Sequence, residues 1–194
     1  MVRRRHSLWA ESEAEPSLDM KQKFSRIRAF AFDVDGVMTD GGIFANNDGS
    51  LFRTFDAKDA FGLRMAAMNG YILCAITGGR DISILKRLMI CGFKEEDIYL
   101  GSRIKITDFE DFCARHGLKP EEVMYFGDDI PDIPVLKAGG CGVCPSDAVQ
   151  EAKDAADFIS DRPGGRLCVR NTLELVMKQQ GKWYVDYDKY HNMF

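Results

Sequence analysis

The chain has 194 residues, of which 45% are hydrophobic and 29% are charged, and its formal net charge is −4. This length suits one sizeable α/β domain with short extensions. The mild acidity argues against a nucleic-acid binder, which would carry a basic face, and no apolar run approaches the roughly 20 residues of a membrane-spanning helix.

The two ends of the chain differ in composition from the middle. The first residues are basic and then acidic, with no apolar stretch, so they do not form a secretory signal peptide. We expect residues 1–25 to be a disordered extension, with Met20 as an alternative start of the native chain. Residues 26–180 are expected to form the domain, and residues 181–194 an aromatic-rich tail.

Six cysteines are scattered through apolar segments. Without a secretory signal we expect reduced thiols in a cytoplasmic protein. Cys141 and Cys144 have the spacing of a metal or redox pair, but they lie in a strand-like stretch with no second pair to accompany them. A role in the hydrophobic core is therefore the favoured interpretation.

Strand-like and helix-like segments alternate after residue 26. Strands are expected over 28–34, 71–76, 97–100, 123–126, 141–144 and 157–159, and helices over 59–69, 81–91, 104–116, 133–138, 146–153 (capped by Ser146) and 167–179. Asn47-Asp48-Gly49 is a hairpin signal between residues 42–46 and 50–55. The alternation predicts a single Rossmann-like α/β domain, with a central parallel sheet flanked by helices and a β-hairpin inserted after the first strand.

Reactive side chains follow several of these strands. Asp33 and Asp35 end the first strand, and Thr77 follows the second. Lys105 opens the helix after the short third strand, and Asp128 follows residues 123–126. Ligands of open α/β sheets bind beyond the carboxyl ends of the strands, carboxylates suit Mg²⁺, and a hydroxyl and an ammonium suit phosphate oxygens. Each signal alone is weak, but together they supply what aspartate-based phosphoryl transfer needs.

The order DVDGV, TGGR, a later lysine and GDD resembles the haloacid dehalogenase-like phosphohydrolases. The resemblance implies that Asp33 attacks phosphorus and that Asp35 serves as general acid and then general base. Thr77 and Lys105 would hold the phosphoryl group. The implied Mg²⁺ ligands are Asp33, Asp35, which would also bind through its backbone carbonyl, and Asp128, supported by Asp129 and Asp132. We expect the carboxyl groups of Asp33, Asp35 and Asp128 to gather around one divalent ion.

Longer segments, AITGGR, GSRIK and YFGDDIPDIPVL, resemble a narrower family, the capless 3-deoxy-D-manno-octulosonate 8-phosphate phosphatases. Only about forty residues separate Asp35 from Thr77, which leaves no room for a cap domain. The resemblance implies a homotetramer that acts on a sugar-acid phosphate in lipopolysaccharide sugar synthesis, without nucleic-acid or membrane partners. The implied substrate-binding residues are Asp35, Asp56, Ala57, Lys58, Asp59, Ala60, Arg64, Gly79, Arg80, Arg87 and Lys105.

Two features of the resemblance concern neighbouring subunits. The glycine-rich segment Gly164 to Arg170 would reach a neighbouring active site. The hairpin carries the apolar side chains Phe44, Leu51, Phe52 and Phe55, which we expect to pack between subunits; the alternative is that they cover the domain's own core. The sequence Thr77-Gly78-Gly79-Arg80 replaces the family's Thr-Gly-Arg, so either Gly79 or Arg80 takes the usual arginine position.

Three other functions remain open from the sequence. A nine-carbon, sialic-type sugar-acid 9-phosphate would suit the same chemistry. A non-catalytic capless domain that only oligomerises would have no need of five matched polar residues. A receiver-type signalling domain also groups acids, a threonine and a lysine, but it lacks an acid two residues beyond the phosphorylated aspartate.

Overall fold

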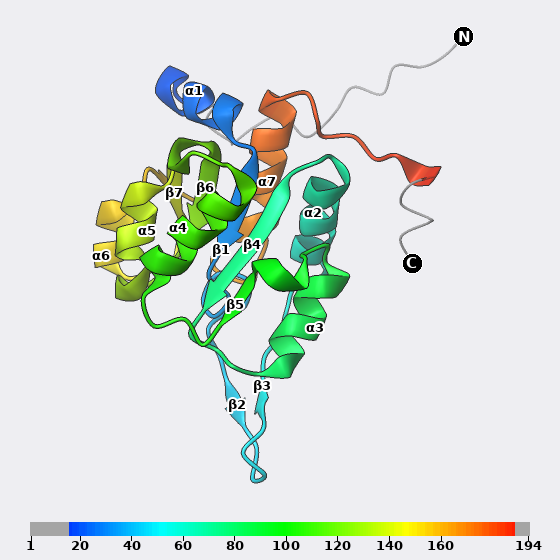
Figure 1. Ribbon diagram of the computed structural model, residues 1–194, viewed down its shortest axis with the longest axis vertical. Helices are drawn as coiled ribbons and strands as arrows, with labels where there is room; N and C mark the ends of the chain where they lie inside the picture. Colours follow the sequence, from blue (N-terminus) through cyan, green and yellow to red (C-terminus); the bar gives the residue numbers. More distant parts are fainter. Residues whose placement is uncertain (1–15, 189–194) are drawn as a thin grey trace.

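Six short parallel strands form the centre of the molecule (Figure 1). The structure is a computed structural model that describes residues 16–188. The strands run in the order β5-β4-β1-β6-β7-β8. Their bounds are β1 Ala29–Phe32, β4 Ile72–Thr77, β5 Ile98–Leu100, β6 Val123–Phe126, β7 Cys141–Cys144 and β8 Phe158–Ile159. Every residue of β1 and β6 is buried, as expected for central strands covered on both faces.

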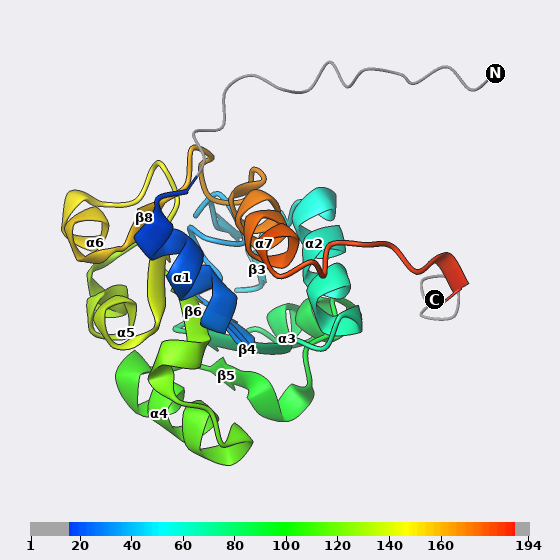
Figure 2. The ribbon, with the colours of Figure 1, turned by 90° about the horizontal axis from the view of Figure 1, so that it is seen from above.

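Helices cover both faces of the sheet (Figure 2). One core cluster joins the sheet to α1, α2, α3 and α7, and the other joins it to α4, α5 and α6. The helix bounds are α1 Leu18–Arg26, α2 Ala57–Met68, α3 Ile82–Ile90, α4 Lys105–His116, α5 Ile133–Ala138, α6 Gln150–Ala155 and α7 Cys168–Gln179, with short 3₁₀ helices at Glu95–Asp97, Pro120–Glu122 and Ile130–Asp132. Within residues 16–188, no helix is long and apolar enough to cross a membrane.

This architecture confirms the predicted fold class, and two local predictions are corrected. Helix α6 begins at Gln150 with Val149 at its N-cap, so Ser146 does not cap it. Residues 18–25, which we expected to be disordered, belong to α1. Met20 and Phe24 of that helix are buried, and the Phe24 ring packs edge-on against Phe158. Because α1 covers otherwise exposed core, it is part of the domain; residues 1–15 lie outside the described part of the chain.

The predicted hairpin is present and projects from the end of the sheet where the strands terminate (Figure 1). Strands β2 Phe44–Ala45 and β3 Leu51–Phe52 pair antiparallel. The Phe44 and Phe52 side chains are 72% and 56% exposed, whereas Phe55 packs against the core. The hairpin therefore covers its own domain only through its base.

The six cysteines are all free and buried. Cys141 and Cys144 lie in β7 and are fully buried. Burial raises the pKa of both thiols to about 12, which disfavours the thiolate that metal binding or redox exchange requires. The expected core role of this pair is confirmed.

Candidate active site

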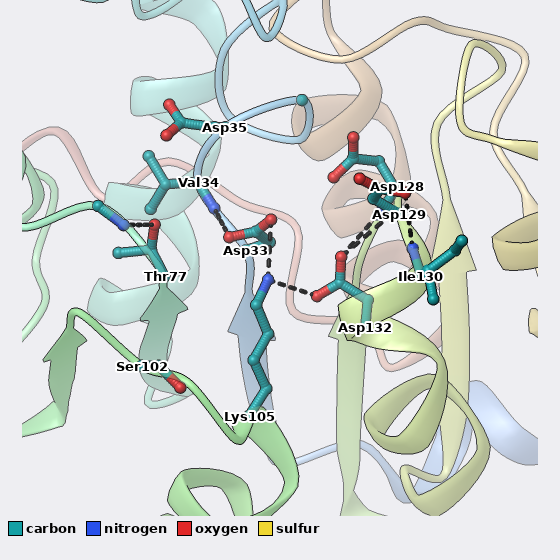
Figure 3. Close-up of polar contacts among 12 residues, drawn as sticks. Asp33, Val34, Asp35, Thr77, Ser102, Lys105, Asp128, Asp129, Ile130 and Asp132 are labelled. Atoms are coloured by element: carbon teal, nitrogen blue, oxygen red, sulfur yellow. Dashed lines mark hydrogen bonds and ion pairs between the residues drawn. The ribbon is translucent and has the colours of Figure 1, made fainter.

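The ends of three neighbouring strands bring the predicted catalytic side chains together (Figure 3). Since β1 lies between β4 and β6, Asp33, directly after β1, lies centrally. Thr77 is the last residue of β4, and Asp128 follows β6 after one glycine. Lys105 enters as the first residue of α4. Their convergence is the consequence of parallel strands ending at one edge of the sheet.

Lys105 joins two buried carboxylates. Its Nζ lies 2.9 Å from Asp33 Oδ2 and 2.7 Å from Asp132 Oδ1. Asp33 Oδ1 accepts a 2.7 Å hydrogen bond from the Val34 amide. Burial, together with the charge of Asp132, raises the pKa of Asp33 against the opposing effect of Lys105. Burial by itself would lower the pKa of Lys105, but the charges of Asp33 and Asp132 outweigh it and raise that pKa.

Asp132 is the polar centre of this cluster and is fully buried. Besides Lys105, its Oδ1 accepts a 2.6 Å hydrogen bond from the Tyr125 hydroxyl. Its Oδ2 accepts the amides of Asp128 and Asp129 at 3.2 and 3.3 Å. With both oxygens already bonded, Asp132 orients Lys105 and the loop after β6. No sequence pattern singles out Tyr125, which looks like an ordinary apolar residue of a buried strand.

Carboxylate oxygens of Asp33, Asp128 and Asp132 lie within 4.8 Å of one another. Asp128 Oδ1 is buried and has no hydrogen-bond partner. Burial, followed by the charge of Asp33, raises the pKa of Asp128 to about 7. An oxygen that is desolvated and unpartnered beside another carboxylate suits a hard divalent cation, which would satisfy it and relieve the repulsion. The residues present therefore fit the expected Mg²⁺.

Gly36 makes the approach of Asp128 possible. Its φ of +89° lies in the left-handed region, and a Cβ atom there would lie 2.1 Å from Asp128 Oδ2. Only glycine satisfies both conditions without displacing the carboxylate. The Gly36 that follows the two acids in the sequence is thus explained by the metal site as well as by the turn.

The carboxylate of Asp35 does not join the cluster. Arg53 Nε donates to Asp35 Oδ1 at 2.6 Å, and the Arg53 NH2 group donates to Oδ2 at 3.1 Å. In Figure 3, the Asp35 carboxylate lies apart from those of Asp33 and Asp128. The expectation that the carboxylates of Asp33, Asp35 and Asp128 share one ion is corrected: the third carboxylate is that of Asp132. A ligand role for the Asp35 backbone carbonyl stays a prediction.

The turn after β4 offers a hydroxyl and a cation. Thr77 is buried, and its Oγ1 accepts a 3.1 Å hydrogen bond from the Gly79 amide, so its O–H remains able to donate. Arg80 is exposed. Its side chain lies beside Gly101, where an added Cβ atom would be 3.0 Å from the Nε of Arg80. Gly79 itself lies against Arg53, since a Cβ there would be 3.3 Å from the NH2 group.

The predicted substrate segment at the start of α2 has two kinds of residue. Ala57 and Lys58 are exposed, and the Asp56 carboxylate caps α2 by accepting the amides of Lys58 and Asp59 at 2.6 and 3.2 Å. Asp59 and Ala60 are buried instead. Substrate binding by this segment stays a prediction.

Asp59 has a structural role. Its carboxylate accepts the amides of Leu167 and Arg170, at 3.2 and 2.7 Å, where α7 begins. Burial raises its pKa to about 6 against these bonds. A helix N-terminus has unpaired amides and a positive dipole end, so this carboxylate joins α2 to α7.

Of the remaining predicted substrate residues, Arg64 and Arg87 are half-buried, and the Arg87 guanidinium lies 5.9 Å from the centre of the Phe55 ring. Their contacts with substrate stay predictions.

The glycine-rich segment packs within its own chain. Gly164 and Gly165 are buried, and the Gly165 amide donates to the Val37 carbonyl at 2.9 Å. A Cβ atom on Gly164 would lie 1.8 Å from the Gly36 carbonyl oxygen. These two glycines therefore support the loop after their own β1, and contact of the segment Gly164 to Arg170 with a neighbouring active site stays a prediction.

Comparisons with known proteins agree with this geometry. The haloacid dehalogenase-like hydrolase family matches residues 96–163. A 3-deoxy-D-manno-octulosonate 8-phosphate phosphatase of Escherichia coli K12 is 33% identical over 166 residues, covering 86% of this chain and 87% of the relative. The crystal structure of the phosphatase of that name from Yersinia pestis is 32% identical and has a TM-score of 0.82, covering 85% of this chain and 88% of the other.

One solved structure contains ligands. The 3-deoxy-D-manno-octulosonate 8-phosphate phosphatase of Moraxella catarrhalis, in complex with magnesium, phosphate and the sugar acid KDO, has a TM-score of 0.81. It is 29% identical, and the match covers 91% of this chain and 98% of that one.

Proposed function

We infer the function from one premise: the chain belongs to the 3-deoxy-D-manno-octulosonate 8-phosphate phosphatase family of haloacid dehalogenase-like hydrolases. We propose that it is a Mg²⁺-dependent phosphatase that converts 3-deoxy-D-manno-octulosonate 8-phosphate into the free sugar acid and phosphate, in lipopolysaccharide sugar synthesis. The observation that carries this proposal is the cluster of buried Asp33 and Lys105 with half-buried Asp128, whose Oδ1 atom is buried and unpartnered. The relative with bound magnesium, phosphate and KDO supports it.

The proposed reaction has two steps at Asp33. Its carboxylate attacks phosphorus, the bond between phosphorus and the sugar oxygen breaks, and Asp35 gives a proton to the departing oxygen. Asp35 then takes a proton from a water molecule, whose oxygen attacks the aspartyl-phosphate and regenerates Asp33. Lys105 and the Thr77 hydroxyl hold the phosphoryl oxygens. Mg²⁺ bound by Asp33, Asp128 and the Asp35 carbonyl supplies positive charge that offsets repulsion between nucleophile and phosphate.

The substrate carries a carboxylate as well as a phosphate, so cations must surround the pocket entrance. We propose that Lys58, Arg64, Arg80 and Arg87 bind these anionic groups, with Gly79 leaving room beside Thr77. Arginine suits this role because its planar guanidinium pairs with a carboxylate through two bonds. The backbone of residues 56–60 completes the proposed substrate site.

We also propose a homotetramer in the cytoplasm. The absence of space for a cap between Asp35 and Thr77 leaves the site in need of a cover. The exposed Phe44 and Phe52 side chains of the hairpin support packing against another subunit. Six free thiols are consistent with a reducing compartment.

Phosphate release from a panel of sugar-acid phosphates tests the proposal. We expect turnover of the eight-carbon 8-phosphate with Mg²⁺, loss of turnover with a chelator, and slower turnover of a nine-carbon 9-phosphate. Faster turnover of the nine-carbon ester would reassign the substrate. Asp33→Asn is expected to reduce turnover by at least about 10⁴-fold while the fold is retained; activity retained in this variant would refute the nucleophile.

A further inference from the structure

Arg53 is the most constrained arginine near the site, although nothing in the sequence pattern draws attention to it. It follows β3 at the base of the hairpin, and its side chain is only 4% exposed. All three guanidinium nitrogens donate to carboxylates. Nε and the NH2 group bind the two oxygens of Asp35, and the NH1 group lies 2.9 Å from Asp81 Oδ2. The guanidinium therefore bridges the loop after β1 and the start of α3.

Asp81 gives independent support for a specific role. It occupies the N-cap of α3, where an aspartate normally accepts an amide of the first turn. Here its side chain makes no such bond, and its Oδ2 instead accepts from Arg53. The Asp81 carboxylate thus fixes the orientation of Arg53 instead of capping α3.

The two contacts between Arg53 and Asp35 are unequal. The Nε–Oδ1 distance is 2.6 Å, whereas the distance from the NH2 group to Oδ2 is 3.1 Å. When a carboxyl is protonated, the oxygen that carries the proton becomes a donor and a weaker acceptor than the carbonyl oxygen, so the longer contact is the one that protonation would weaken. Oδ1 is therefore the anchored oxygen, and Oδ2 is the oxygen that can exchange the guanidinium contact for a proton.

We propose, on the basis of the proposed function, that Arg53 is the positioning residue of the general acid and base Asp35. Arg53 Nε holds Oδ1 throughout, and Oδ2 carries the working proton. When Oδ2–H gives its proton to the departing sugar oxygen, the carboxylate that forms regains the bond from the NH2 group. When Oδ2 takes a proton from water in the second step, that bond opens again. Arg53 thus stabilises the charge that appears on Asp35 as the ester bond breaks.

Esters with different leaving groups distinguish this role from simple support of the fold. A sugar alkoxide needs a proton as it departs, whereas p-nitrophenolate leaves without one. We expect Arg53→Gln to reduce kcat/KM for the sugar-acid phosphate by about 10²-fold, the size of a general-acid contribution. This parameter reports the steps through cleavage of the ester bond and not the second step, which both esters share. The kcat/KM for p-nitrophenyl phosphate should change little. Arg53→Lys, which keeps the charge but not the fork, should recover part of the lost rate.

Two further variants serve as comparisons. Asp81→Asn, which loosens the anchor, should shift the ratio of the two rates in the same direction by a smaller factor. Arg115→Gln is a matched control. Arg115 lies on α4 and also bridges two carboxylates, those of Asp97 and Asp111, at 3.0 Å each. It should leave the ratio unchanged. Thermal melts of every variant report folding, and if Arg53→Gln does not fold, Arg53→Lys and Asp81→Asn supply the ratio.

Equal losses with both esters, or no loss with either, would overturn the role of Arg53. The proposed function would survive either result, provided that the wild type hydrolyses p-nitrophenyl phosphate with Mg²⁺ and Asp33→Asn does not. Failure of the wild type to hydrolyse both esters would instead overturn the proposed function, and this inference with it.

Discussion

The candidate active site and the hairpin lie at the same end of the sheet, yet they are built in opposite ways. In the candidate active site, buried polar groups have several partners from their own chain; Lys105 and Asp132 are examples. In the hairpin, Phe44 and Phe52 are apolar and exposed. The first region is specified by the chain itself, whereas the second has an apolar surface that its own domain does not cover. Under the proposed function, chemistry and subunit assembly would depend on separate sets of residues that meet at the base of the hairpin.

Removal of the Lys105 charge should have the largest effect on stability. Lys105→Met leaves Asp33 and Asp132 buried without their cation, a change that typically costs about 3–5 kcal/mol. The loss should be greater at pH 8 than at pH 5, because burial raises the pKa of Asp33 and its carboxyl can protonate at the lower pH. Chemical unfolding at both pH values measures it. The control Lys23→Met removes a half-exposed pair with Asp157 and should cost less than about 1 kcal/mol; similar losses in the two variants would contradict the contrast.

Two glycines with similar φ angles, one in each region, allow the two regions to be compared by the same substitution. Gly36 has φ +89° and faces Asp128, whereas Gly49, at the hairpin tip, has φ +83° and no atom within 4 Å of a Cβ placed there. Gly49→Ala should cost about 1–2 kcal/mol through its backbone alone. Gly36→Ala should cost more and should also weaken Mg²⁺ binding. Calorimetric titration with Mg²⁺ would contradict this if both variants bound the ion as tightly as the wild type.

The stability of the metal-free protein should depend on pH because of the carboxyl groups in the candidate active site. Asp128 has a pKa raised to about 7 in the folded state, from 3.8, so between these values the folded state binds more protons than the unfolded state. Stability should therefore fall as pH rises through this range. We expect the melting temperature in chelator to be several degrees lower at pH 8 than at pH 5, and Mg²⁺ to restore most of the difference.

Asp128→Asn supplies the control for this pH dependence. The variant should melt higher than the wild type at pH 8 in chelator, because it removes a buried repulsive charge, and it should gain little from Mg²⁺. Asp59, whose pKa is raised to about 6, should make the melting temperature of both proteins fall slightly with rising pH. A steeper slope in the variant would be inconsistent with this assignment.

The smallest effect on the free energy of unfolding is expected in the hairpin. Phe44→Ser combined with Phe52→Ser should change it by less than about 0.5 kcal/mol per subunit, as for other exposed positions, but should lower the subunit number found by analytical ultracentrifugation. Phe55→Ser should instead destabilise each subunit, since Phe55 packs against the core. An unchanged assembly in the double variant would refute the proposed role of the hairpin.

Sequence patterns were sufficient where a local rule determines the structure. Apolar runs predict β1 and β6, and polar residues at their ends predict the meeting of Asp33 with Asp128. The patterns failed where the partner depends on three-dimensional placement. The pairing of Arg53 with Asp35 needs the hairpin to fold back beside the site. The presence of the Asp132 carboxylate in the cluster, in place of that of Asp35, depends on the direction in which each side chain points.

The packing of Gly164 and Gly165 against the loop after β1 has a consequence for synthesis of the protein. Gly164 and Gly165 lie beneath Gly36 and Thr39, although every proposed catalytic residue has left the ribosome well before them. A nascent chain that stops before Gly164 would carry every proposed catalytic residue but would lack these two glycines and the Leu167 and Arg170 amides that bind Asp59. Competence for turnover should consequently arise late in translation, in one concerted event, as the last helix docks.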